Sequence, residues 1–165
     1  MGRLVRELGP LAVGVALFGV VIAWLLQSGN PIGSWLLAAF LIGHGLVHVM
    51  FAIPQKAVQP ATAGGPQWAF GMDQSWLLSP MGATTGALRA LGMALIAVTV
   101  VAFALAGLAT IPLLLPATLW PALIVVASVA SLGLMTMFFN PYLVIGVAID
   151  LVLIWIALAA AWLPG

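Results

Sequence analysis

Residues 141–162 read PYLVIGVAIDLVLIWIALAAAW, and this run places one carboxylate, Asp150, among side chains that are almost all apolar. As a helix the run is long enough to cross about 30 Å of hydrocarbon, which takes about 20 residues. Asp150 is also the only charged residue that follows Arg89 in the chain. We therefore expect a membrane-spanning helix that buries an acidic group, and such a group needs a hydrogen-bond donor.

The composition of the whole chain agrees with a membrane location. Of the 165 residues, 65% are hydrophobic and 4% are charged, proportions far from those of a soluble domain. The net charge of +1 offers no basic surface, so we expect no nucleic-acid partner. The absence of cysteine excludes disulfides, thiolate metal sites and a nucleophilic thiol.

Five apolar stretches of sufficient length are bounded by turn residues, and they predict an all-α polytopic bundle that forms a single transmembrane domain over residues 1–165. The expected spans are about 8–26, 33–53, 84–108, 118–139 and 141–162. Asn140 and Pro141 predict a tight turn, so the last two spans form an antiparallel hairpin. The first stretch is longer than the apolar region of a signal peptide, which favours a retained span over a cleaved one.

The basic residues predict how the bundle is oriented. All four fall on one face of a five-span bundle; they are Arg3, Arg6, Lys56 and Arg89. Because Lys and Arg near span ends are retained on the cytoplasmic side, we expect the N-terminus inside and the C-terminus outside a bacterial cytoplasmic membrane. The indoles expected at the opposite interface are those of Trp24, Trp35, Trp120 and Trp162.

The segment between the second and third spans, residues 55–82, is predicted to be a polar cytoplasmic loop. Its Trp68, Asp73 and Trp76 are candidates for contact with the membrane interface. The sequence DQSWLL at residues 73–78 favours a short capped helix at about 73–79 that lies on the membrane surface. A plain loop with incidental tryptophans explains the same residues equally well.

Polar residues inside the spans meet at similar depths if each helix rises about 1.5 Å per residue. Counted from the cytoplasmic span ends, His44 and Asp150 both lie about 13 Å deep, whereas His48 and Arg89 lie about 7 Å deep. Ser131 in the fourth span is close to the level of His44 and Asp150. An ionised carboxylate at the bilayer centre costs about 2.5 to 3.5 kcal/mol, so Asp150 is expected to face the interior with His44 as its best partner.

The two histidines lie one turn apart on one face of the second span. Gly43 and Gly45 remove side-chain bulk beside them, so the sequence predicts the close approach of a neighbouring helix or of a flat ligand. This face is therefore expected to point into the bundle.

Four interpretations of His44, His48, Arg89, Ser131 and Asp150 stay open. They satisfy one another and fix helix packing, or they form a ligand site or a proton path. A third interpretation is a cofactor site, with His44, His48 and Asp150 binding a divalent metal ion or one histidine binding a haem. Nucleophilic catalysis by a serine has the least support, because no nucleophile motif surrounds any serine of the chain.

Several short motifs add a resemblance. They are GHGLVH at residues 43–48, SWLL at 75–78, LRALG at 88–92, and PYLVIG at 141–146 followed by Ile149 and Asp150. With them the chain resembles a loose group of uncharacterised small bacterial polytopic membrane proteins that have an HGxxH helix and an aspartate in the last span. The resemblance implies a bacterial cytoplasmic-membrane location and draws attention to the HGxxH face and Asp150, but it implies no activity.

The sequence favours a non-enzymatic role in the lipid bilayer. The expected role is that of an accessory subunit in a larger membrane complex or homo-oligomer, or of a binder of a hydrophobic small molecule. The alternatives are a component of proton or ion translocation, and a membrane redox protein that binds metal or haem through His44, His48 and Asp150. Outside this last alternative no cofactor is predicted.

Overall fold

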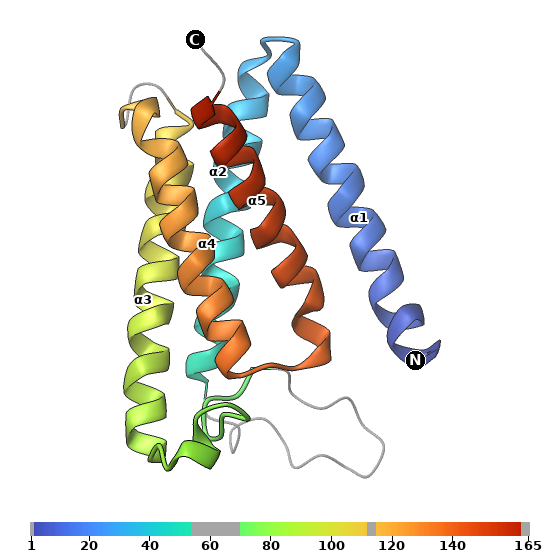
Figure 1. The fold of residues 1–165 in the computed structure, drawn as a ribbon. Coiled ribbons are helices and arrows are strands. Elements are labelled where there is room, and N and C mark those ends of the chain that lie inside the picture. The colour runs from blue at the N-terminus through green and yellow to red at the C-terminus, as the bar shows by residue number, and fades with distance from the viewer. Residues whose placement is uncertain (1, 54–69, 112–114, 163–165) are drawn as a thin grey trace.

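In the computed structural model, which describes residues 2–53, 70–111 and 115–162, the chain is a bundle of five long helices (Figure 1). The helices are α1 (Gly2–Gln27), α2 (Pro31–Val47), α3 (Thr85–Ala109), α4 (Trp120–Met137) and α5 (Val144–Trp162). Short 3-10 helices extend or connect them, namely η1 (His48–Ala52), η3 (Ser79–Met81), η4 (Ala117–Leu119) and η5 (Pro141–Leu143). Counted together with the 3-10 helices that extend α2, α4 and α5, all five are long and apolar enough to cross a membrane. The predicted all-α bundle with five spans is confirmed.

Asparagine and proline start two of the spans, at Asn140 and Pro141 as the sequence predicts and also at Asn30 and Pro31, slightly before the expected start at 33. Asn30 Oδ1 accepts a hydrogen bond from the Ile32 amide, and Pro31 is the first helical residue of α2. Asn140 Oδ1 accepts from the Tyr142 amide in the same way, so the turn from α4 into η5 and α5 is tight. A side-chain oxygen satisfies an otherwise free amide in each turn, and proline occupies a position where no amide is needed.

The helices alternate in direction, so their ends gather at two opposite faces of the bundle (Figure 1). One face holds the start of α1, the end of η1, the start of α3 and the end of α4; we name it the basic end, because Arg6 and Arg89 lie there. Lys56 and Trp68, which the sequence places in the same region, lie outside the described residues. The C-terminal part of α5 lies at the opposite end, as expected for an odd number of crossings.

Helix α3 is the centre of the packing, with α2 on one side and α4 on another, while α5 packs against α4. Helix α1 packs chiefly against α2 and stands apart from the rest in Figure 1. Ile22 is its one buried residue among those whose exposure is described. The core is therefore built by the last four helices, and α1 presents most of its surface outward.

Two glycines allow α2 and α3 to come close. A Cβ atom added at Gly45 would lie 2.9 Å from Phe103 Cβ, and one added at Gly107 would lie 2.9 Å from the Ala38 carbonyl oxygen. Gly43, in contrast, has nothing within 4 Å of such an atom and is exposed. The predicted close approach is thus made by a neighbouring helix at Gly45, and Gly43 takes no part in it.

The segment that precedes α3 differs from the predicted surface helix at residues 73–79. Residues 76–78 form a turn that leads into η3, and Ser75 is the residue that caps it, since its Oγ accepts from the Leu77 and Leu78 amides. Ser75 Oγ also donates to the Met137 carbonyl at 2.6 Å, and Trp76 Nε1 donates to the Thr136 carbonyl at 2.7 Å. These two side chains bind free carbonyls at the end of α4, which holds the segment as a turn against the bundle.

Substitution of the two neighbouring glycines of α2 tests this packing. Gly45→Ala is expected to lower the free energy of unfolding by about 1 to 3 kcal/mol, because its Cβ would collide with Phe103. Gly43→Ala is the matched control and is expected to leave stability unchanged or raise it by up to about 1 kcal/mol, since alanine favours helix. Thermal unfolding in mild detergent measures both, and equal changes in Tm would contradict the close approach at Gly45.

Candidate functional site

Four polar side chains meet in the interior of the bundle, and we name them the His/Ser/Asp cluster: His44 from α2, His48 from η1, Ser131 from α4 and Asp150 from α5. Ser131 and Asp150 are completely buried, His48 is 4% exposed, and the His44 side chain is 9% exposed. The depth count from the sequence therefore predicts the meeting of His44 with Asp150 correctly.

Four hydrogen bonds connect the cluster. His44 Nε2 lies 3.0 Å from Asp150 Oδ1, and Ser131 Oγ lies 2.5 Å from Asp150 Oδ2. The same Ser131 Oγ lies 2.7 Å from His48 Nε2, and His48 Nδ1 lies 3.0 Å from the carbonyl oxygen of His44. Asp150 thus has a partner on each carboxylate oxygen, and the hydroxyl of Ser131 stands between the carboxylate and the second imidazole.

The donors and acceptors of the cluster fix the position of one proton and limit where a second proton can lie. A carbonyl oxygen only accepts, so His48 Nδ1 carries a proton and donates it to the His44 carbonyl. The Nε2 atom of a neutral His48 is then an acceptor. Ser131 has a single hydroxyl proton but faces two acceptors, this Nε2 and Asp150 Oδ2. Both contacts are hydrogen bonds only if one further proton resides on Asp150 or on His48.

Two arrangements of that further proton fit the distances. In the first, Asp150 is protonated and donates to Ser131, which donates to a neutral His48. In the second, His48 is an imidazolium and donates to Ser131, which donates to the Asp150 carboxylate. Two short proton transfers along the same line of atoms convert one arrangement into the other. Ser131 is therefore positioned to relay a proton between Asp150 and His48.

Local structure and aromatic rings hold the imidazoles in place. The α-helix ends at Val47 and tightens into η1 at His48, where the His48 amide donates to the carbonyls of Gly45 and Leu46. The His44 ring stacks on Phe40, with centroids 6.0 Å apart and planes at 9°, and it meets the edge of Phe103 at 5.0 Å.

His48 stacks in turn on Phe51, with ring centroids 6.5 Å apart and planes at 19°. Apolar rings thus lie against both histidines, and they exclude water from the hydrogen bonds. In such a medium electrostatic interactions are stronger than in water.

Arg89 lies outside the cluster, although its depth counted along the sequence places it level with His48. Its Nε atom donates to Asp73 Oδ1 at 3.0 Å, and its Nη2 atom contacts the same oxygen. The Arg89 side chain is 54% exposed and that of Asp73 is 38% exposed. The long arginine side chain carries its charge away from its Cα position to the surface of the basic end, so the predicted grouping of Arg89 with the histidines is corrected.

The hydrogen bonds of the cluster also bear on the hypothesis that His44, His48 and Asp150 bind a metal ion. Within the described residues, no group of three or more His, Asp or Glu side chains is placed to hold a metal ion. His44 and His48 each use a ring Nε2 for a hydrogen bond inside the cluster, and His48 Nδ1 is engaged as well. The geometry therefore supports hydrogen bonding and proton exchange rather than a site for metal coordination.

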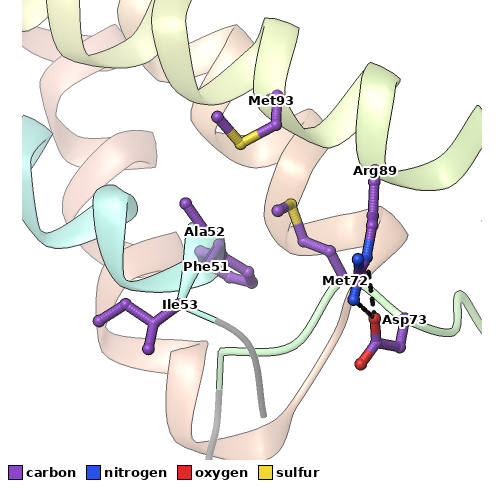
Figure 2. A pocket seen from close by; sticks show the side chains of 7 residues that line it. All are labelled: Phe51, Ala52, Ile53, Met72, Asp73, Arg89 and Met93. Atoms are coloured by element: carbon purple, nitrogen blue, oxygen red, sulfur yellow. Dashed lines mark hydrogen bonds and ion pairs between the residues drawn. The ribbon is translucent and has the colours of Figure 1, made fainter. Parts of the chain in front are cut away.

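Two hollows flank the bundle. A cavity of about 110 Å³ at the basic end is lined by residues of η1, by Met72 and Asp73, and by Arg89 and Met93 of α3 (Figure 2). A larger apolar groove of about 780 Å³ runs between α1 and α5, with Phe40 of α2 and Trp120 of α4 also lining it. The sequence predicts neither hollow, because runs of apolar residues look alike whether they face a ring, a groove or lipid.

The rings that contact the histidines are the site residues that the sequence interpretation missed. Phe40 and Phe51 are the clearest cases, and the signal that could have indicated them is their spacing of four and three residues from His44 and His48, which places each ring on the same helix face as its histidine. Comparison of the chain with protein-family models, with curated proteins and with solved structures finds no match. The function of the cluster must therefore be argued from its own chemistry.

Asp150 and Asp73 allow the loss of a buried carboxylate to be compared with the loss of a partly exposed one by its effect on stability. Asp150→Ala is expected to lower the free energy of unfolding by about 1 to 3 kcal/mol, because it leaves buried donors without acceptors. Asp73→Ala removes an ion pair that is partly exposed, and its cost is expected to be about 1 kcal/mol or less. Thermal unfolding of both variants in one detergent measures the difference, and a smaller effect at Asp150 than at Asp73 would contradict the hydrogen bonds of the cluster.

Proposed function

We propose that this protein is a proton-carrying component of a bacterial cytoplasmic membrane, and that it binds and releases a proton at the His/Ser/Asp cluster. The observation that carries the proposal is the Ser131 hydroxyl, which lies within 2.7 Å of His48 Nε2 and 2.5 Å of Asp150 Oδ2. A hydroxyl between a carboxylate and an imidazole is a short proton relay. Ionisable groups inside membrane spans commonly mark such relays.

The surroundings of Asp150 favour exchange of the proton over its permanent storage in the cluster. A lone carboxylate in the hydrocarbon region is costly, but here it has a donor on each oxygen. Imidazole is the side chain whose ordinary pKa lies closest to neutral pH, so it takes up and releases protons under cellular conditions. A buried carboxyl and an imidazole that share one proton therefore form a site with two accessible states.

The distribution of basic residues supports an orientation with the basic end in the cytoplasm. Arg6 and Arg89 both lie at that end, and Arg and Lys near span ends are retained on the cytoplasmic side. We propose on this basis that the N-terminus is inside. His48 is then the member of the cluster nearer the cytoplasm, because η1 continues α2 toward the basic end.

Proton flux into vesicles tests the proposal. Purified protein in lipid vesicles with a pH-sensitive dye inside is expected to conduct protons when a potassium gradient sets a membrane potential. Ser131→Ala is expected to reduce the flux at least about tenfold, because the relay atom is lost. Ser131→Thr keeps the hydroxyl and is expected to restore most of the flux.

Ser28→Ala serves as the control for these variants, since the Ser28 hydroxyl bonds only its own turn at the Leu25 carbonyl. A flux through the unaltered protein no greater than through Asp150→Asn would overturn the proposal. A Ser131→Ala protein that conducts as well as the unaltered one would also overturn it.

The groove between α1 and α5 favours a second candidate function, the binding of a long, flexible hydrocarbon molecule taken from the bilayer. The residues that line it are apolar throughout, among them Phe18 of α1, Phe40 of α2 and Ile149 of α5. Phe18 and Phe40 contact each other with ring centroids 6.0 Å apart, so they join α1 to α2 along one wall. A groove of about 780 Å³ with almost no polar surface suits a hydrocarbon chain better than a polar ligand.

Filling the groove tests this second function. Ala148 is exposed on α5 and lines the groove, so Ala148→Trp is expected to remove most of the lipid-soluble material that co-purifies with the protein. Ala97→Trp adds the same bulk at an exposed position of α3 away from the groove and is expected to change nothing. Mass spectrometry of organic extracts measures both, and equal retention by the two variants would exclude a specific occupant.

A further inference from the structure

The cavity at the basic end lies against the residue that stacks on His48. Phe51 lines this cavity, and the same ring lies parallel to the imidazole of His48 at 6.5 Å. Figure 2 shows Phe51 and its neighbours of η1 on one side of the cavity and the Arg89–Asp73 ion pair on the other. One side chain therefore separates a hollow that reaches charged groups from the second imidazole of the cluster.

We propose that this cavity is a water-binding chamber through which protons reach His48 from the basic end, and that Phe51 limits their passage. The inference rests on the proposed proton-carrying function and adds a route to it. The ligand of the chamber is water, and the group that exchanges protons with the solution is the carboxylate of Asp73.

The size and lining of the cavity fit water. A volume of about 110 Å³ accommodates several molecules, because one water needs roughly 10 to 15 Å³ of such space. Buried water also needs polar partners, and Asp73 and Arg89 provide charged ones at the wall of the cavity. Both side chains are partly exposed, so they connect the chamber with the solution.

The side chain of Phe51 is buried and tightly packed against other rings. It is 2% exposed, its ring meets the edge of Phe70 at 5.1 Å, and it lies 6.4 Å from the ring of Phe138. The rings of Phe70 and Phe138 thus hold the Phe51 ring in its place between the chamber and His48. Rotation of the Phe51 side chain would bring water from the chamber to the imidazole of His48.

The titratable groups along this route are few. Residues 90–149 contain no Asp, Glu, Lys, Arg or His, so α4 and all of α3 beyond Arg89 contribute no charge. The groups that face the route are Asp73 and Arg89 at the chamber and His48, His44 and Asp150 in the cluster. Glu7 of α1, at the same end of the bundle, accepts a hydrogen bond from the Tyr142 hydroxyl. A proton from the chamber therefore meets His48 first.

The experiment is a pH jump followed by time-resolved infrared spectroscopy of the full chain in lipid. The carboxyl and imidazole bands that disappear in Asp150→Asn define the signal of the cluster. Phe51→Ala is expected to speed the appearance of this signal about tenfold, because the barrier ring is gone. Met93→Trp fills the chamber from an exposed position and is expected to slow it by a similar factor.

Two matched controls accompany these variants. Phe139→Ala removes an exposed ring at the same end of the bundle, and Leu91→Trp adds the same bulk to an exposed position of α3 that does not line the chamber. Both are expected to respond at the rate of the unaltered protein. Because Met93 is exposed, Met93→Trp is expected to fold, so it tests the chamber as a proton route even if Phe51→Ala does not fold.

The possible outcomes separate the two proposals. If the unaltered protein shows no band that depends on Asp150 at any pH between about 5 and 9, a range that brackets the ordinary pKa of imidazole, the proton-carrying function itself fails. If the band is present but both chamber variants respond at the rate of their controls, the chamber is overturned while proton binding stands. A slower signal in Met93→Trp alone supports the route.

Discussion

The structure depends on the need to satisfy one carboxyl group where there is no water. Asp150 is completely buried in a helix that crosses the hydrocarbon region, and its two oxygens take their partners from α2 and α4. Helices α2 and α5 are not among the closely packed pairs of the bundle, and the hydrogen bond between His44 and Asp150 joins them at this level. The position of the carboxyl along α5 therefore sets the heights at which three helices must meet.

Packing and proton binding are usually treated as rival explanations for a buried polar cluster, but in this protein they are coupled. The hydroxyl of Ser131 cannot donate to His48 and Asp150 at once, so the observed contacts are all satisfied only when the cluster holds one proton beyond those of a neutral His48 and an ionised Asp150. Loss of that proton breaks a buried hydrogen bond. The bonds by which Ser131 joins α4 to η1 and to α5 are consequently sensitive to protonation.

The sequence predicts features that follow from counting residues along regular helices. It does not predict contacts that depend on how far a side chain extends. Five spans and the contact between His44 and Asp150 follow from apolar length and from the rise per residue. Arg89 is misplaced by the same count, because the count locates its Cα atom while its guanidinium extends to Asp73. The prediction of a surface helix at 73–79 is wrong for a similar reason. Ser75 and Trp76 bind carbonyls of α4, which lies about 60 residues further along the chain, and no local pattern reveals such partners.

The His/Ser/Asp cluster has different surroundings toward the two ends of the bundle, and this difference matters for any function in proton transfer. Toward the basic end a single ring, that of Phe51, separates His48 from a cavity with charged walls. Toward the other end the core contains Leu41, Phe103 and Ile124, all of them fully buried and apolar. A site with access from one end exchanges protons with that side only, so net transport requires a second arrangement in which the apolar side opens. The helix best suited to such a change is α5, because it carries Asp150, whose hydrogen bond to Ser131 depends on the protonation of the cluster.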